Sequence, residues 1–425
     1  VAPLQHTAQV STRDLNDHHG IVVARDVMSA AAIPPFTNSA MDGFLVRSTD
    51  LAGDGPWTFP VSGDIPAGSP PVPVPAGHAV RIMTGAPVPE DPDTKGDELC
   101  VIPIENTDAR NDVMPTTVTV KDYNPHRAHI RYRGEHVQPG DVVTHAGTRI
   151  DAGVIATLIS AGVEQVELYP RPTVCVITSG DEVGDARNAW GIPNSNGPML
   201  VAAAHASGAV PTHRHVRDDA TAVHAAIDTA ASEFDLVVTV GGVSAGAYDV
   251  VRAVGGTADM WFGPVDIQPG KPQGLGTWNG TPVMCLPGNP VAAYVSFFLF
   301  VVPVLHTLAG MPAPHSVWDR PHVSAFVSDD FPQPGPRTRF IPVQLTWGEH
   351  GATATLPYGR DSRRRSWFSC FTCGIRTSRS HVRGCSVCVS SPTEEGMMKF
   401  THLDNAGSAY MVDVTDKQPT VRSAT

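Results

Sequence analysis

Glycine-containing turns occur at three places between residues 177 and 293, and they hold the residues best suited to chemistry. They are ITSGDEV (177–183), TVGGVSAGAYD (239–249) and CLPGNPVAA (285–293). Each follows a predicted strand. Glycine lets the backbone approach a ligand closely, and N–H groups at the start of a following helix bind phosphate. Three such turns at one sheet edge therefore favour a pocket for an anion.

Carboxylates lie in or near two of these turns. Asp181 and Glu182 follow the first strand, Asp249 ends the second turn, and Asp218 and Asp219 follow a strand that ends in Val-Arg. Carboxylates repel a bare phosphate, so the combination predicts Mg²⁺ bridging carboxylate and phosphate oxygens. Asp218 and Asp219 have an alternative interpretation as helix N-caps. The candidate metal ligands are therefore Glu182 and Asp249.

Three further segments are candidates for the same site. PGKPQGLG (269–276) holds Lys271 between two prolines, which orients its charge toward an anion, although most single lysines are simply solvated. PPFTNSAMDGF (34–44) and RIMTGAPVPE (81–90) contain Asn38, Asp42 and Thr84. Taken alone, the last two segments could be plain turns.

The elements that must position these residues follow from the apolar pattern. Residues 30–170 alternate short apolar runs with Pro and Gly, which is typical of β-rich structure. From Arg171, strands rich in Val and Ile alternate with amphipathic helices, which predicts a parallel sheet covered on both faces. PGKPQGLG is expected to be a loop. After Gly310 three strands are expected in HVSAFVSDDF, RFIPVQLTW and ATATLPYG.

The predicted fold class is multidomain α/β plus β, with a central doubly wound α/β domain and β-rich N-terminal domains. The expected domains are an elongated N-terminal domain (1–30 and 125–168), a β-rich domain (31–124), the α/β domain (169–312), a partial C-terminal β domain (313–359) and an aberrant tail (360–425).

Composition excludes some partners. The 425 residues carry a net charge of −12, which argues against nucleic acid. The N-terminus lacks the basic and apolar regions of a secretory signal, so we expect a cytoplasmic protein. The apolar run at 291–310 is interrupted by Pro303, which favours a buried helix over a membrane span.

Eight segments, in order and spacing, resemble the molybdopterin molybdenumtransferase family, that is, the MoeA proteins and the gephyrin E domain. The resemblance covers residues 10–359 and includes PPFTNSAMDGF, RIMTGAPVPE, RYRGEHVQPGD, RPTVCVITSGDEV, NSNGPML, DLVVTVGGVSAGAYD, PGKPQGLG and LPGNPVAA. The resemblance implies that the chain inserts molybdate into adenylylated molybdopterin with Mg²⁺ and releases AMP. It also implies a homodimer, with molybdopterin adenylyltransferase or molybdoenzymes as further partners. Neither nucleic acid nor a membrane is expected as a partner.

The same resemblance implies roles for individual residues. The expected catalytic residues are Asp42, Thr84, Glu182, Asp249 and Lys271. The expected substrate-binding residues are Gly180, Asp218, Gly241, Gly242, Ser244, Pro287, Gly288 and Pro290. In a family homodimer, Asp42 of one subunit faces the α/β domain of the other.

Two departures from the family pattern leave alternatives open. The family usually has Gly-Glu-Asp where this chain has Gly134-Glu135-His136, and Gln268 replaces a frequent lysine. A neutral imidazole cannot supply a carboxylate charge, although it can hydrogen-bond an oxyanion. One alternative is a catalytically impaired molybdopterin-binding or scaffold protein. Another is a molybdopterin adenylyltransferase, which needs only the α/β domain.

The last 66 residues differ from the rest of the chain. Residues 360–383 contain seven arginines and no apolar periodicity. Cys370, Cys373, Cys385 and Cys388 have the spacing of a zinc ribbon, but with an 11-residue spacer and no evident strand pattern. Residues from Met397 resemble the start of the cyclic pyranopterin monophosphate synthase (MoaC) family. We interpret 360–396 as a frame-shifted segment, with zinc as the rival interpretation.

Overall fold

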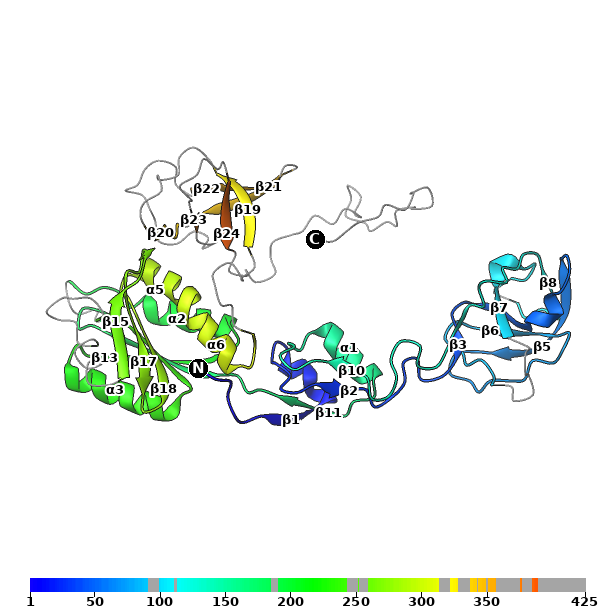
Figure 1. Ribbon diagram of the computed structural model, residues 1–425, viewed down its shortest axis with the longest axis horizontal. Coiled ribbons are helices and arrows are strands. Elements are labelled where there is room, and N and C mark those ends of the chain that lie inside the picture. The colour runs from blue at the N-terminus through cyan, green and yellow to red at the C-terminus, as the bar shows by residue number, and fades with distance from the viewer. Residues whose placement is uncertain are drawn as a thin grey trace. The chain divides into compact units, whose positions relative to one another are not determined.

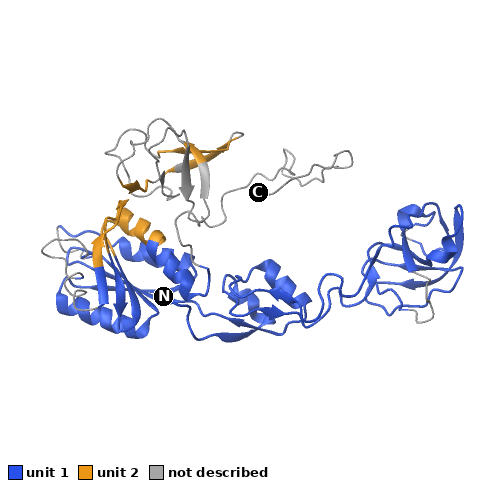
Figure 2. Cartoon of the chain, in the orientation of Figure 1, with its two compact units in different colours: residues 1–261, 274–285, 300–313 blue, residues 262–273, 286–299, 314–425 orange. Residues whose placement is uncertain are grey.

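The computed structural model describes most of the first 312 residues and parts of the rest. The described ranges are 1–90, 99–110, 113–184, 190–242, 251, 259–312, 322–327, 337–341, 343–348, 351–356, 375–376 and 384–388. Two compact units divide the chain (Figure 2). Unit 1 contains residues 1–261, 274–285 and 300–313; unit 2 contains residues 262–273, 286–299 and 314–425.

The first part of unit 1 is built from both ends of the first 168 residues. Strand β1 (Ala8–Ser11) pairs antiparallel with β11 (Gln165–Leu168), and β2 (Val27–Met28) with β10 (Val142–Thr144). A short 3₁₀ helix, η1 (Thr12–His18), and helix α1 (Ala152–Ser160) complete it. Its core contains Leu15, Val23, Val27, Ile150, Leu158, Val166 and Leu168.

A five-stranded sheet of order β7-β4-β6-β5-β8 follows, as the β-rich pattern predicts. Its strands are β4 (Gly43–Arg47), β5 (Trp57–Ile65), β6 (Ala79–Ile82), β7 (Leu99–Pro103) and β8 (Thr117–Val120). Alternate residues enter separate cores: Phe44 and Ile102 pack in one, Leu45 and Val101 in the other. Two short 3₁₀ helices, η2 (Ser48–Leu51) and η3 (Ile104–Asn106), flank β4 and β7.

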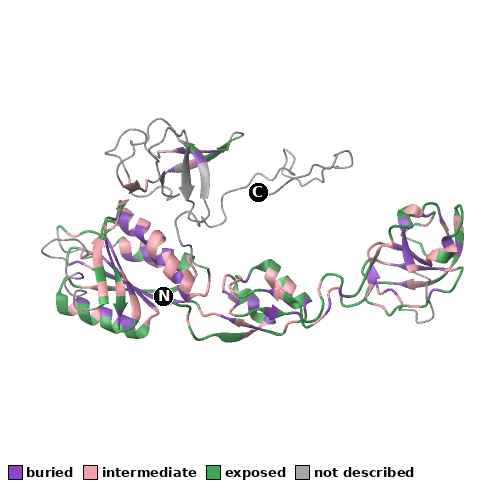
Figure 3. Ribbon diagram, in the orientation of Figure 1, coloured by how far each residue is buried: buried purple, intermediate pink, exposed green. Residues whose placement is uncertain are grey.

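The central α/β domain is organised around a six-stranded sheet of order β13-β12-β14-β18-β17-β15 (Figure 1). Its strands are β12 (Thr173–Ser179), β13 (Val210–Val216), β14 (Leu236–Val240), β15 (Asp259–Pro264), β17 (Pro272–Trp278) and β18 (Thr281–Leu286). Its helices include α2 (Asn196–Ala206) and α3 (Ala220–Glu233). Figure 3 shows buried residues in the sheet of this domain, and β14 is buried at every position, which agrees with its run of Leu and Val.

The sheet is mixed, which corrects the prediction of a parallel sheet. Strand β12 runs parallel to β13 and β14, but β17 and β18 form an antiparallel hairpin. The two-residue turn is Asn279-Gly280, with φ of +52° and +88°. Asn-Gly favours this turn because both residues tolerate positive φ. The expected loop 269–276 is therefore limited to its first residues, since β17 begins at Pro272.

The apolar run after β18 forms one continuous helical segment. It comprises α5 (Pro290–Ser296), a π-helical turn (Phe297–Val301) and α6 (Val302–Leu308). The segment Pro290–Leu308 is long and apolar enough to cross a membrane, yet 44% of its most apolar 18-residue stretch is buried inside the protein. Core helices of globular proteins satisfy the same criteria. The helix expected at SAGAYDVVRAVG lies outside the described residues, apart from Val251.

Unit 2 contains a five-stranded sheet of order β21-β22-β19-β24-β23. Three strands occur where they were expected: β19 (His322–Val327), β21 (Gln344–Gly348) and β22 (Gly351–Thr355). The other two, β23 (Ile375–Arg376) and β24 (Gly384–Cys388), lie in the segment where no strand was expected. Backbone pairing of β24 with β19 does not depend on the apolar alternation that this segment lacks. A separate pair joins β16 (Ile267–Gln268) to β20 (Thr338–Arg339).

At Gly43 the backbones of strands β4 and β7 leave no room for a side chain. A Cβ atom on this residue would lie 2.0 Å from the carbonyl oxygen of Ile102, which is backbone and cannot rotate away. The sequence must therefore keep glycine directly after Asp42.

We predict that Gly43→Ala destabilises the protein by about 3 kcal/mol or more, because the added methyl group forces two strands apart. The measurement is the urea unfolding midpoint followed by circular dichroism. Gly348→Ala is the matched control, since a Cβ atom there meets nothing within 4 Å. Equal midpoints for the two variants would contradict the steric explanation.

Candidate functional site

Asp42 and Thr84 meet in the β-rich region, 42 residues apart in sequence. The Thr84 backbone N–H and side-chain hydroxyl both donate to Asp42 Oδ1, at 2.6 and 2.7 Å. These two bonds lower the pKa of Asp42 below its ordinary value. The bond from the Thr84 hydroxyl has the larger effect, and the bond from the Thr84 backbone N–H adds to it. No donor among the described residues contacts Asp42 Oδ2. The carboxylate is thus held ionised with one oxygen available to a ligand.

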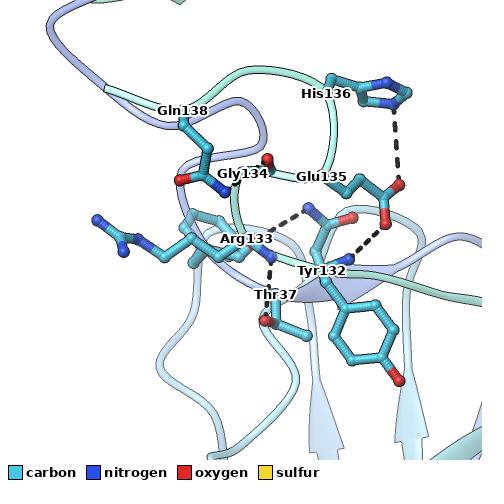
Figure 4. Close-up of polar contacts among 9 residues, drawn as sticks. Thr37, Tyr132, Arg133, Gly134, Glu135, His136 and Gln138 are labelled. Atoms are coloured by element: carbon cyan, nitrogen blue, oxygen red, sulfur yellow. Dashed lines mark hydrogen bonds and ion pairs between the residues drawn. The ribbon is translucent and has the colours of Figure 1, made fainter. Parts of the chain in front are cut away.

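The turn that carries His136 (Figure 4) follows strand β9 (Ile130–Arg131), which pairs with β3 (Asn38–Ser39). The Glu135 carboxylate accepts a hydrogen bond from the Tyr132 backbone N–H at 2.8 Å, and its other oxygen lies 3.8 Å from His136 Nε2. The His136 side chain is 68% exposed. The histidine therefore faces solvent beside a carboxylate and can interact with a bound ligand.

The His136 turn is tied to the segment that precedes Asp42. The Arg133 backbone N–H donates to Thr37 Oγ1 at 3.2 Å, and Arg133 Nε donates to the carbonyl of Pro35 at 3.1 Å. Next to these bonds lies Asn38, which is 7% exposed and whose Oδ1 has no hydrogen-bond donor among the described residues. A buried acceptor without a partner is uncommon, so Asn38 Oδ1 can accept a bond from a ligand or a water molecule.

The first and second glycine turns lie at one edge of the α/β sheet. Strands β12, β13 and β14 run parallel, with Ser179 opposite Val216 and Thr178 opposite Val240. The residues after these strands therefore emerge together: Gly180–Glu182, Arg217–Asp219 and Gly241–Gly242. Gly180 has a φ of +132°, and a Cβ atom there would lie 3.0 Å from both Glu182 Oε2 and Val183 Cγ2. Glycine at 180 thus lets the Glu182 side chain fold over its own turn.

The four acidic side chains at this edge have different environments. Asp219 caps α3 by accepting from the Ala222 N–H at 2.9 Å, which confirms the capping interpretation for this residue. Asp181 Oδ1 accepts from the backbone N–H of Asp218 at 3.4 Å and lies 3.9 Å from Arg217 Nε. Glu182 is exposed, and its carboxylate makes no hydrogen bond or ion pair with any described residue. Glu182 is the acidic group most available to a ligand.

A polar cluster beneath the first turn joins β12, β13 and the approach to α2. The hydroxyl of Thr178, which is 2% exposed, lies 2.9 Å from His213 Nε2 and 3.0 Å from His215 Nδ1. Asn194 Nδ2 donates to the same hydroxyl at 2.9 Å, and Asn194 Oδ1 accepts from the Gly197 N–H. The pKa of His213 is lowered, mainly because part of its ring is buried and also because His215 lies nearby. The residue as a whole is nevertheless exposed. None of these four residues was among the candidates, although two histidines two residues apart on a strand share one face.

Lys271 belongs to unit 2, in the turn between β16 and β17. Gln273, 4% exposed, donates through Nε2 to the carbonyl of Gly270 at 2.7 Å and to Ser296 Oγ at 2.6 Å. The Lys271 carbonyl accepts from the Val265 N–H at 2.7 Å. The turn is therefore fixed by buried hydrogen bonds, while the lysine side chain is exposed.

The third glycine turn is also in unit 2, at the start of α5. Asn289 is the N-cap: its Oδ1 accepts from the N–H groups of Val291 and Ala292, at 3.1 and 3.2 Å. Pro290 occupies the first turn of the helix, where its missing N–H has no cost. Pro287 is buried and Gly288 is exposed. Asn289 was not among the candidate residues, although Asn followed by Pro is a helix-start signal.

Several candidates lie outside the described residues. They include Ser244, Asp249, Cys370, Cys373 and the segment from Met397, while Cys385 and Cys388 lie on β24 without a description of their side chains. Within the described part of the chain, no group of three His, Cys, Asp or Glu side chains is placed to hold a metal ion.

We predict that Thr84→Val raises the pKa of Asp42 toward its ordinary value, because two donors become one. A ¹³C NMR titration of the aspartate carboxyl groups measures the shift, and Thr58→Val, remote from Asp42, is the control.

Because the pKa of Asp42 is lower in the folded than in the unfolded protein, its ionisation stabilises the fold at pH values above the unfolded-state pKa. This contribution is lost as the pH falls through the folded-state pKa. The destabilisation by Thr84→Val should therefore be larger at neutral pH than at pH values below both pKa values. An Asp42 pKa that does not change in Thr84→Val would contradict this assignment.

Two protein-family models match consecutive regions of the chain. The model described as "MoeA N-terminal region (domain I and II)" matches residues 1–162, and the one described as "Probable molybdopterin binding domain" matches residues 175–307. Residues 163–174, which lie between the two matches, contain β11 and the first two residues of β12.

Individual proteins agree with these matches. The molybdopterin molybdenumtransferase 2 of Mycobacterium tuberculosis is 36% identical over 377 residues, covering 84% of this chain and 88% of that protein. The molybdopterin molybdenumtransferase of Bacillus subtilis is 34% identical over 349 residues, covering 80% and 79%. A crystal structure of the molybdopterin biosynthesis MoeA protein from Pyrococcus horikoshii OT3 has the same fold, with a TM-score of 0.70, 22% identity, and coverage of 91% and 96%. The chain therefore belongs to the molybdopterin molybdenumtransferase (MoeA) family, as its sequence motifs indicate.

Proposed function

We propose that this protein inserts molybdate into adenylylated molybdopterin and releases AMP, as a step of molybdenum cofactor biosynthesis. The observation that carries the proposal is the sheet edge after β12, β13 and β14. There Gly180 and Gly241 adopt positive φ, and the Glu182 carboxylate is unpaired with any described residue. The relatives named for this activity align over four fifths of the chain or more.

The residues of this chain have separate parts in the proposal. The glycine turns present backbone N–H groups to the phosphates of the substrate, and Lys271 supplies positive charge for an anion such as molybdate. Asp42, kept ionised by Thr84, offers Oδ2 as an acceptor for a hydrogen-bond donor of the substrate. His136, in place of the usual acid, can donate a hydrogen bond to an oxyanion.

We further propose that Mg²⁺ takes part, held by Glu182 and Asp249. The exposed and unpaired Glu182 carboxylate is a hard oxygen ligand of the kind that Mg²⁺ prefers. When bound, the ion would neutralise phosphate charge that these carboxylates would otherwise repel.

The two alternatives fit the observations less well. A molybdopterin adenylyltransferase needs only the α/β domain, whereas residues 1–162 match the additional N-terminal region. An inactive scaffold protein has no need to hold the Asp42 carboxylate ionised with a free oxygen.

We predict that the purified protein releases AMP from adenylylated molybdopterin only when molybdate and Mg²⁺ are present, and that the product reconstitutes a molybdoenzyme. Glu182→Ala should reduce AMP release at least about 100-fold while the protein still folds, because a charged ligand of the substrate site is removed. AMP is quantified by chromatography, and folding by circular dichroism.

Glu164→Ala is the matched control, since Glu164 is an exposed carboxylate outside the proposed site. Unchanged activity of Glu182→Ala would refute the role of Glu182. Tight binding of adenylylated molybdopterin without AMP release would favour the scaffold interpretation.

We also propose a cytoplasmic homodimer in which Asp42 of one subunit acts with Glu182 of the other. Asp42→Asn and Glu182→Ala are each expected to be inactive. A mixture of equal amounts, allowed to exchange subunits, should recover about a quarter of the wild-type activity, since half of the dimers contain one intact site. No recovery, despite proven subunit exchange, would place both residues in one subunit.

A further inference from the structure

A cavity of ≈ 180 Å³ lies in unit 1, away from the sheet edge that carries Glu182. It is lined by segments 19–22, 170–172 and 205–208, together with Arg149, Ala309 and Met311. It therefore lies where the β1–β11 region meets the C-terminal ends of α2 and α6. Such a volume holds several water molecules or one small oxyanion.

The titratable side chains that line the cavity are all basic. They are His19, Arg149, Arg171 and His205, and no carboxylate lines it. The chain as a whole has 42 Asp and Glu residues against 30 Lys and Arg residues. Within the described ranges, neither Arg149 nor Arg171 forms an ion pair with a carboxylate. Both arginines are exposed, so their guanidinium groups are open to solvent and to a ligand from solution.

The backbone carbonyls at the adjoining helix ends are already occupied. At the end of α2, the carbonyls of Ala203, Ala204 and His205 accept from the backbone N–H groups of Ser207, Ala209 and Gly208. At the end of α6, the carbonyls of Leu305, His306 and Thr307 accept from residues 309, 311 and 310. Helix C-termini attract positive charge, and the guanidinium groups of Arg149 and Arg171 beside the cavity supply it.

Hydrogen-bond donors at the cavity are, by contrast, in excess. Arg149 Nε donates to the Gly20 carbonyl at 3.3 Å, and Arg171 Nη2 donates to the His19 carbonyl at 3.4 Å. These bonds anchor both side chains to one loop. Each guanidinium has five N–H donors, so most of them remain for a ligand.

We propose that this cavity binds a tetrahedral oxyanion of the phosphate class, either as the free ion or as a phosphomonoester. Guanidinium groups bind such oxygens in bidentate fashion, and a hydrogen bond to the loop at 19–20 holds each of the two side chains beside the cavity. The site is separate from the proposed substrate site, and its existence does not depend on molybdenum insertion.

The test is equilibrium dialysis of the full-length protein with ³²P-labelled inorganic phosphate. The wild-type protein should bind phosphate at a saturable site. The affinity of this site should fall about 100-fold in Arg149→Gln/Arg171→Gln, which is about tenfold for each arginine lost. The double variant Arg13→Gln/Arg127→Gln loses the same charge on exposed residues outside the cavity and should bind like the wild type. Arg171→Lys, which keeps the charge without the planar fork, should weaken binding less than Arg171→Gln.

Competition identifies the source of the oxyanion. Displacement of phosphate by sulfate and molybdate at similar concentrations indicates a site for free oxyanions, whereas stronger displacement by glycerol 3-phosphate indicates a phosphomonoester. Binding that is equal in the wild type and Arg149→Gln/Arg171→Gln, with both proteins folded by circular dichroism, would overturn the proposal. So would the absence of saturable phosphate binding to the wild-type protein.

Discussion

The parallel pairing of β12 with β13 and β14 is the constraint on which the α/β site depends. Parallel strands in register end together, so turns far apart in sequence come to one edge of the sheet. The strands themselves contribute little chemistry, since β12 and β14 are almost wholly buried. Their apolar side chains fix the positions of the polar residues that follow them. Substitutions in these strands would act on the site through its geometry.

Asp42 and Glu182 show two opposite ways of presenting a carboxylate. Asp42 is held by two donors from Thr84, so its charge and its orientation are set before any ligand arrives. Glu182 has no partner among the described residues and lies over a glycine turn that leaves it room. The first arrangement favours a fixed hydrogen-bond acceptor, because little reorganisation is needed on binding. The second suits a group that changes position when its ligand binds.

Local patterns predicted much of this structure, and tertiary contacts determined the rest. Runs of Val and Ile predicted β12 and β14, and the alternation of short apolar runs with Pro and Gly predicted the β-rich region around Asp42. The β17–β18 hairpin was missed although Asn279-Gly280 is a local signal for it, because the preceding Gly and Pro residues suggested a loop. The steric demand at Gly43 and the pairing of β24 with β19 could not be predicted, because each depends on a distant backbone segment.

The hydroxyl of Thr178 limits how its neighbours can be protonated. A hydroxyl has one proton and two lone pairs, and Asn194 occupies one lone pair. Of the two imidazoles, one must then donate to the remaining lone pair while the other accepts the hydroxyl proton. The tautomers of His213 and His215 are consequently linked, and exchanging them requires the hydroxyl to rotate. One buried oxygen atom thus makes two histidines on an edge strand behave as a single unit with two states.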